Sequence, residues 1–186
     1  MGLLIMSNTG HYLNKNAVHN VVQYITRTRK GETKEQDLLG YGAIGVGVYT
    51  SAEEIIRHIC YVQELNRISA RGGRRMYHEW FLIKDEEYWM LGNNIELVKK
   101  IAWECASLFF VAGFQVVYGI HWQPDKRLHI HFGVSTINIR DGRKWHSSKR
   151  DLEYRMEMFN KILYKYIALV QVACQKEYCC PIEFIA

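Results

Sequence analysis

Three histidines occur close together in the stretch "HWQPDKRLHIHF" at residues 121–132: His121, His129 and His131. Neutral imidazole nitrogens are common ligands of divalent metal ions. Three imidazoles that converge on one point leave open coordination positions, which is the arrangement of a catalytic metal site and not of a closed structural one. Structural zinc sites usually include cysteine, and no cysteine lies near these histidines. The pattern therefore favours a catalytic divalent-metal site.

The residues around the histidines predict the hairpin that would bring them together. Residues 114–122 and 127–138 have strand composition, and "QPDK" between them reads as a short turn in which Asp125 is a turn former. Side chains alternate between the two faces of a strand, so His129 and His131 share one face. The antiparallel return places His121 beside them. Isolated histidines are usually ordinary core or surface residues, but three on one face would repel one another when charged and would be costly to bury unpaired.

The rest of the chain predicts an α+β fold with a central antiparallel β-sheet flanked by about four helices. Hydrophobic periodicity and capping residues predict the helices, and β-branched and aromatic composition predicts a further strand. Residues 41–50 are rich in glycine and predict either a strand or an irregular segment. At 186 residues, the chain is expected to form a single domain over 1–186. The helices are expected at 16–29, 51–69, 93–113 and 147–173, and the further strand at 76–84.

Composition restricts the class of protein and its compartment. A formal net charge of +5 fits contact with nucleic acid, although many proteins carry such a charge. The five cysteines show no CxxC spacing, which predicts reduced thiols. With no signal peptide and no apolar run of membrane-spanning length, we expect a cytoplasmic protein without a membrane segment.

Residues 114–146, "FQVVYGIHWQPDKRLHIHFGVSTINIRDGRKWH", resemble the metal-binding motif of the HUH mobilisation relaxases of conjugative and mobilisable elements. In that motif a strand ending in His is followed by a turn, His-apolar-His, a short strand and a "DG-basic" turn. "VVQYITRTRKGE" is similar to the relaxase helix that carries the nucleophilic tyrosine, and "MYHEWFLIK" is similar to the strand before the long helix. The resemblance spans roughly residues 16–165. Ser135 departs from it, because these relaxases commonly have Asn there.

The resemblance implies site- and strand-specific nicking and rejoining of single-stranded DNA at an origin of transfer. Tyr24 would attack the phosphodiester and form a 5′-phosphotyrosyl bond, leaving a free 3′-OH. His121, His129 and His131 would hold a divalent metal ion, Mg²⁺ or Mn²⁺ in the first place, with Zn²⁺ as a further option. The implied partners are origin DNA, relaxosome accessory proteins and a coupling ATPase.

Two other functions fit the sequence. The first is a rolling-circle replication initiator of the same superfamily, which would use Tyr164 or Tyr166 on the last predicted helix. The second is a non-catalytic DNA-binding domain in which the histidines hold a structural metal or none.

A neighbouring pair, His78 and Glu79, lies on the predicted strand 76–84, where only one of the two can face the histidines. We assign Glu79 to the site, as a general base or as a partner that orients a metal-bound imidazole. The alternative is an ordinary surface glutamate. Asp125 is expected first of all to form the turn; its second possible role is that of a carboxylate near the metal.

Basic residues form several groups that could neutralise DNA phosphates. The first group follows Tyr24 and the last follows the histidine hairpin, so both are expected to flank the site. Trp122 and Trp145 are candidates for stacking on unpaired bases. The predicted DNA-binding residues are Arg27, Arg29, Lys30, Arg74, Arg75, Lys126, Arg127, Arg143 and Lys144, with Arg71 and Arg140 adjoining two of the groups.

Overall fold

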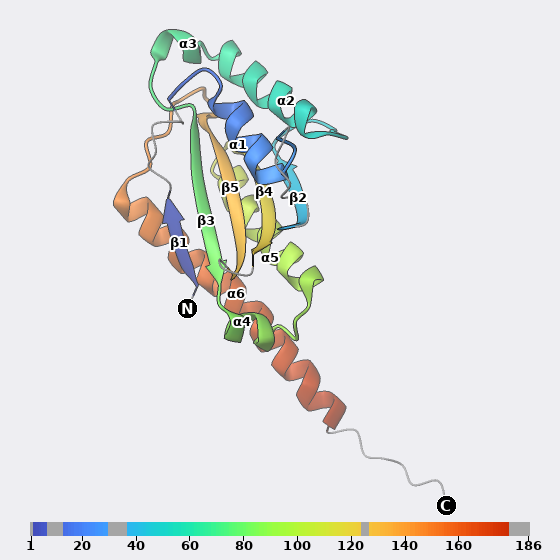
Figure 1. The fold of residues 1–186 in the computed structure, drawn as a ribbon. Coiled ribbons are helices and arrows are strands. Elements are labelled where there is room, and N and C mark those ends of the chain that lie inside the picture. Colours follow the sequence, from blue (N-terminus) through green and yellow to red (C-terminus); the bar gives the residue numbers. More distant parts are fainter. Residues whose placement is uncertain (1, 7–12, 30–36, 124–126, 179–186) are drawn as a thin grey trace, which may run out of the picture.

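The computed structural model describes residues 2–6, 13–29, 37–123 and 127–178. Its centre is a five-stranded antiparallel sheet with the strand order β1-β3-β5-β4-β2 (Figure 1). The strands are β1 (Leu3–Met6), β2 (Leu38–Ile44), β3 (Met76–Ile83), β4 (Phe114–Gln123) and β5 (Arg127–Asn138). The predicted histidine hairpin is thus confirmed as β4 and β5, which occupy the middle of the sheet.

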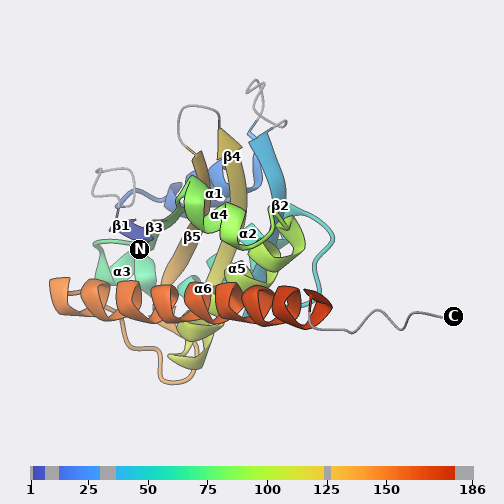
Figure 2. The ribbon, with the colours of Figure 1, turned by 90° about the horizontal axis from the view of Figure 1, so that it is seen from below.

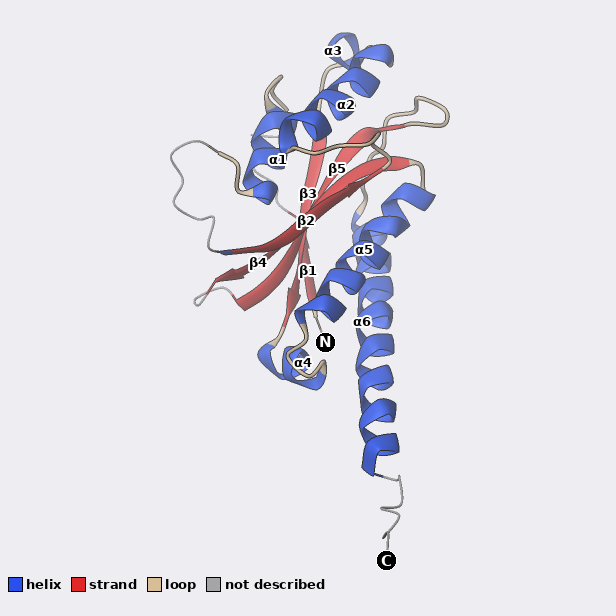
Figure 3. Ribbon diagram, turned by 90° about the vertical axis from the view of Figure 1, so that its right-hand side faces the viewer, coloured by secondary structure: helices blue, strands red, loops and turns tan. Residues whose placement is uncertain are grey.

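Helices cover both faces of the sheet, which confirms the predicted α+β class. Figure 3 shows α1 and α2 on one side and α5 and α6 on the other. The four long helices correspond to the four expected ones, but β1 and two short helices were not predicted, because such short segments show too little periodicity. The helices are α1 (Ala17–Thr26), α2 (Ala52–Leu65), α3 (Ile68–Arg71), α4 (Asp85–Met90), α5 (Ile95–Val111) and α6 (Lys149–Tyr178).

The two faces of the sheet carry different side chains. Towards α5 and α6, the strands bury residues such as Phe81, Ile130 and Phe132, which form the larger hydrophobic core. Towards α1 and α2, a second core contains Val21 and Ile25. The three histidines belong to this second face, because alternation along β4 and β5 places them opposite the apolar residues of the larger core. The sequence alternation therefore supplies a core on one side and a polar site on the other.

Two glycines let α1 lie unusually close to the middle of the sheet. A Cβ on Gly119 of β4 would lie 2.5 Å from the carbonyl oxygen of Ile25, and one on Gly133 of β5 would lie 2.7 Å from Cγ1 of Val21. Real Cβ atoms do not approach other heavy atoms so closely, so a side chain at either position forces its neighbours to move, and at Gly119 the nearest neighbour is backbone. The glycines thus set the height of α1 above β4 and β5, and with it the position of Tyr24.

Helix α6 is the longest element and runs across the sheet in the view from below (Figure 2). Its buried residues, among them Phe159 and Leu163, pack into the larger core. Towards its C-terminal end the helix extends past the rest of the fold (Figure 1). In the part of the chain that the structure describes, no helix combines the length and the apolar character that crossing a membrane requires.

Candidate functional site

His121 of β4 and His129 and His131 of β5 converge on the face of the sheet that α1 covers. His121 lies directly opposite His129 in the hairpin. One ligand nitrogen of each imidazole can be chosen so that all three lie within 4.8 Å of one another. The ring centroids of His121 and His131 are 4.5 Å apart, and those of His129 and His131 are 4.7 Å apart. All three side chains are buried. The structure therefore brings together the three predicted ligands.

Hydrogen bonds fix which nitrogen of each imidazole faces the centre. Nε2 of His121 donates to the carbonyl oxygen of Ile25 over 2.7 Å, and Nδ1 of His129 donates to the carbonyl oxygen of Arg127 over 2.9 Å. A neutral imidazole that donates through one nitrogen has a lone pair on the other. Nδ1 of His121 and Nε2 of His131 are buried and have no hydrogen-bond partner among the described residues. Buried polar atoms are rarely left in this state, so these two atoms fit a bound cation.

A fourth histidine, His78 of β3, contacts the cluster from the neighbouring strand. Its Nε2 lies 2.9 Å from Nδ1 of His131, and the contact is buried. If His131 binds a metal through Nε2, its Nδ1 carries the proton and donates to His78. Metal-bound histidines are usually held in this way by an outer acceptor, most often a carboxylate or a carbonyl. Here a neutral imidazole takes that place.

Burial keeps these imidazoles uncharged. Desolvation is the largest cause of a pKa of about 3 for His121 and of about 4 for His78. Desolvation followed by the neighbouring histidines places the pKa of His131 well below its ordinary value. Uncharged imidazoles at neutral pH keep the lone pairs that a metal ion needs.

The placement of Glu79 beside the histidines was wrong. Because His78 points towards the cluster, alternation turns Glu79 to the opposite face of the sheet, where it is fully buried. There its carboxylate accepts a hydrogen bond of 3.0 Å from Nε of Arg155 on α6, within a buried ion pair. Burial raises the pKa of Glu79, and Arg155 opposes that shift. Glu79 therefore stabilises the packing of α6 and has no contact with the site.

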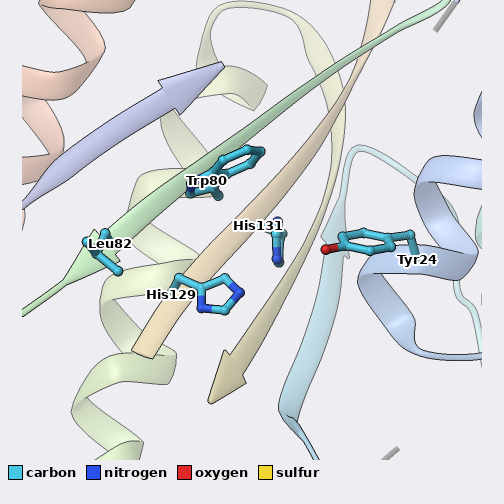
Figure 4. A pocket seen from close by; sticks show the side chains of 5 residues that line it. All are labelled: Tyr24, Trp80, Leu82, His129 and His131. Carbon is cyan, nitrogen blue, oxygen red and sulfur yellow. The ribbon is translucent and has the colours of Figure 1, made fainter. Parts of the chain in front are cut away.

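Tyr24 on α1 lies beside the histidine cluster. Its ring centroid is 5.3 Å from that of His131, 5.5 Å from that of His78 and 6.2 Å from that of His121. Figure 4 shows its hydroxyl group pointing towards His131. The structure thus brings Tyr24 to histidines that lie about a hundred residues away in the sequence.

The two rival tyrosines of α6 lie elsewhere. The hydroxyl of Tyr164 donates to Glu87 over 3.2 Å, and that of Tyr166 donates to Glu104 over 2.6 Å. Desolvation, together with the bond to Glu104, raises the pKa of Tyr166 to about 12. Both tyrosines belong to the α5/α6 side of the sheet, away from the histidines.

Arg27 is a buried cation next to Tyr24. It ends α1 in the left-handed conformation, with φ of 54°, and this turn carries its guanidinium over the Tyr24 ring at 4.8 Å from the centroid. The residue is 3% exposed, and its Nε and Nη2 find no hydrogen-bond partner in the part of the chain that the structure describes. Its charge is one cause of the lowered pKa values of His121 and His131. An unpaired buried cation is costly, and this one fits a site that receives an anion.

A cavity of about 290 Å³ opens beside the histidines (Figure 4). It is lined by Tyr24, Trp80, Leu82, His129 and His131. Sequence reasoning did not select Trp80, although alternation along β3 places it on the same face as His78.

Trp122 and Trp145, the two tryptophans predicted to stack on bases, do not line this cavity. Trp122 is half-exposed and contacts Tyr88 of α4, with ring centroids 5.5 Å apart. Trp145 packs against Tyr77 and stacks on Phe114 in the larger core. Trp145 is partly buried among these aromatic residues, on the side of the sheet opposite the histidines.

The predicted DNA-binding residues divide into two regions of the surface. Arg27 and Arg29 follow Tyr24, and the exposed Arg127 lies near His129 and forms an ion pair of 3.8 Å with Asp85. Lys30, Lys126 and the turn residue Asp125 lie outside the described residues.

The remaining basic residues lie at the far end of the sheet. Hydroxyl Oγ1 of Thr136 donates to the carbonyl oxygens of Arg74 and Arg75, and Lys144 pairs with Ile137. The strand rise from His131 to Ile137 is about 20 Å. Arg143 lies next to Lys144 and is largely exposed. The expectation that this last group flanks the metal strands at the site was wrong, because β5 separates the group from the histidines along its length.

Comparison with known families supplies an independent observation. Residues 13–167 match the model of a family described as relaxase, MobA/VirD2-like, nuclease domain. No curated protein matches the chain.

Proposed function

This chain belongs to the family of relaxases with a MobA/VirD2-like nuclease domain, and on that basis we propose that it cuts and rejoins one strand of DNA at an origin of transfer. Membership of the family implies an endonuclease that nicks DNA. The tyrosine nucleophile and the role in conjugative transfer or mobilisation are part of our proposal. The observation that carries the proposal is the convergence of Tyr24 on three buried histidines. We further propose that residues 1–186 act as one relaxase-type unit, located in the cytoplasm.

Tyr24 is the proposed nucleophile. Its phenolic oxygen would form a bond to the scissile phosphorus as the bond from phosphorus to the 3′-oxygen breaks, which leaves a 5′-phosphotyrosyl link and a free 3′-OH. The reverse reaction rejoins the strand. A phenol is a weak nucleophile at neutral pH, so the surrounding site has to stabilise the developing charge.

His121, His129 and His131 would hold a divalent ion, with His78 holding His131 in the ligating tautomer. When bound, the ion polarises the scissile phosphate and stabilises the charge that develops on it. The fit rests on the closeness of the three histidines and on the buried Nδ1 of His121 and Nε2 of His131, which have no hydrogen-bond partner among the described residues. We propose Mg²⁺ or Mn²⁺ as the ion in the cell, while three imidazoles also suit Zn²⁺.

Arg27 would bind the scissile phosphate from the side of Tyr24. Its Nε and Nη2 form the fork that bonds two phosphate oxygens, and both nitrogens are available. Its burial makes this charge more effective than that of an exposed residue such as Arg143, because solvent does not screen it. Arg29, Lys30, Lys126 and Arg127 would contact neighbouring phosphates, and Arg74, Arg75, Arg143 and Lys144 more distant ones.

A replication initiator that uses Tyr164 or Tyr166 is less well supported. Both hydroxyls bond to carboxylates on the other side of the sheet. A non-catalytic domain with a structural metal gives no reason for a tyrosine and an unpaired buried arginine to lie beside the metal ligands.

The test is covalent capture of single-stranded origin DNA in the presence of Mn²⁺. We expect a protein–DNA adduct with the wild-type chain and with Tyr166→Phe, and none with Tyr24→Phe. Tyr166→Phe is a matched control because it removes the same oxygen on the opposite side of the sheet. An adduct that survives Tyr24→Phe but disappears in Tyr166→Phe would favour the initiator, and no adduct with any variant would favour the binding module. Accessory proteins and a coupling ATPase are proposed partners, testable by affinity capture with proteins of the same element.

A further inference from the structure

We propose that the cavity beside the histidines binds a nucleobase, that of the nucleotide whose 3′-oxygen leaves during cleavage. The inference rests on the proposed function, because it uses the position of the scissile phosphate between Tyr24 and the histidines. It adds a site for a base to a centre described so far only by its contacts to phosphate.

The walls of the cavity suit a flat, apolar ligand. Trp80 and Leu82 are successive residues on one face of β3, and both are only partly buried. Their neighbours in the sheet are His131 and His129 on β5, and Ile5 and Leu3 on the edge strand β1. The Trp80 ring centroid is 6.0 Å from that of His131. An indole this close to a metal ligand can stack on a base attached to a phosphate at the metal.

The direction of attack decides which base enters. In phosphoryl transfer the attacking and leaving oxygens lie roughly in line through phosphorus. Figure 4 shows the hydroxyl of Tyr24 pointing across the cavity, with Trp80 and Leu82 on the far side of the histidines. The leaving 3′-oxygen therefore faces these two residues. Its nucleotide, the last one on the 5′ side of the nick, is the one whose base reaches Trp80.

Trp80 and Leu82 lie away from the closest approach of α1 to the sheet. The glycines that hold α1 close to the sheet are on β4 and β5, whereas Trp80 and Leu82 are on β3 next to the edge strand. The side chains of Trp80 and Leu82 offer an aromatic ring and an aliphatic group, so recognition at this wall depends on stacking and shape more than on hydrogen bonds to the edge of the base.

The first experiment measures binding by fluorescence anisotropy, with EDTA present so that no strand is cut. The probes are a short oligothymidylate and an abasic oligomer of the same length. Trp80→Ala is expected to weaken binding of the oligothymidylate by about 5- to 150-fold, the range for loss of one stacked base, and to leave binding of the abasic oligomer unchanged. Trp80→Phe, which keeps an aromatic ring, should recover most of the affinity.

Trp103→Ala is the matched control, because Trp103 is an exposed tryptophan on α5, on the other side of the sheet. This variant should bind both probes like the wild-type chain. Equal losses on both probes with Trp80→Ala would mean that Trp80 supports phosphate contacts or the fold, and the proposal would be overturned. Unchanged binding of both probes would also overturn it.

The second experiment locates the base. Once the nick has been mapped on origin DNA, an abasic nucleotide is placed on its 5′ side or on its 3′ side. We expect the 5′ change to weaken binding to the wild-type chain and to have no additional effect in Trp80→Ala. The opposite pattern would refute the assignment to the leaving nucleotide. If no nick forms while the first experiment succeeds, the base site stands and the proposed nicking function fails.

Discussion

The close approach of α1 to the sheet predicts a large effect from the smallest side chain that can be added there, in Gly119→Ala. The new Cβ would lie 2.5 Å from the carbonyl oxygen of Ile25, 2.8 Å from its Cγ2 and 3.3 Å from its carbonyl carbon. The nearest atom belongs to the backbone, so a rotamer change does not relieve the contact. The helix has to move away from β4.

The size of the shift follows from that distance. An ordinary contact requires about 1 Å more separation, so α1 and Tyr24, the residue before Ile25, would move by about 1 Å. Misplacement of a reacting group by about 1 Å can cost about 100-fold in rate. The same movement lengthens the hydrogen bond of 2.7 Å from His121 to Ile25. Loss of such an outer contact typically costs about 10- to 100-fold in metal affinity. Overpacking lowers the free energy of unfolding by only about 1–3 kcal/mol.

The assay is the rate of covalent adduct formation on origin DNA at saturating Mn²⁺, with the free energy of unfolding measured in parallel. Gly133→Ala is the matched control. The three atoms nearest to its Cβ would be side-chain atoms, Cγ1 of Val21 at 2.7 Å, Cδ1 of Ile25 at 2.9 Å and Cγ1 of Val117 at 2.9 Å. Side-chain atoms can take up part of such a contact, so the backbone of α1 is expected to move less than in Gly119→Ala. We expect a rate loss approaching 100-fold for Gly119→Ala and a much smaller one for Gly133→Ala.

A folded Gly119→Ala protein with the wild-type rate would refute the reasoning, because it would mean that the approach of α1 to β4 does not position Tyr24. Equal rate losses in the two variants would also contradict it, since they would point to general overpacking.

Three further predictions address the histidines and Glu79. His78→Ala should weaken Mn²⁺ or Zn²⁺ binding by about 10- to 100-fold in calorimetry, because His131 loses its outer partner; unchanged affinity would contradict that role. Glu79→Gln should lower the free energy of unfolding by about 3–5 kcal/mol, because it leaves the buried Arg155 charge unpaired, and metal affinity should stay the same. In the metal-free protein, the unfolded chain takes up protons on His78, His121 and His131 near pH 6.5 while the folded chain does not, because their folded pKa values are lowered. Stability measured by urea denaturation should therefore fall as the pH drops from about 6.5 towards about 4, with a slope of up to about 4 kcal/mol per pH unit; a flat profile would show that the histidines are not buried neutral.

The hairpin was predictable because its information is local. Strand alternation and a short turn are enough to place His121, His129 and His131 on one face, and the observed register pairs His121 with His129 as expected. The pairing of His78 with His131 was not predictable. It depends on the register of β3 against β5, which joins residues more than fifty positions apart.

The same register decided between His78 and Glu79. Alternation shows only that the two neighbours face opposite sides. Which of them faces the three histidines depends on where β3 enters the sheet. Glu79 faces the other side, where it accepts a hydrogen bond from Arg155 of α6. Of these two neighbours the acidic one was therefore assigned to the site, while the structure gives that position to the histidine.

The sequence by itself determined which face carries the three histidines and the α+β class, because both follow from the period of side chains along strands and helices. The resemblance implied Tyr24 at the histidines, but only the tertiary structure decided how they are surrounded: by Tyr24 with the buried Arg27 over its ring from α1, and by His78 and Trp80 from β3. The physical reason is that these contacts arise from the packing of α1 on two glycines and from the pairing of β3 with β5. Both interactions join segments that are far apart in the chain, so the residues near any one of these side chains do not predict them.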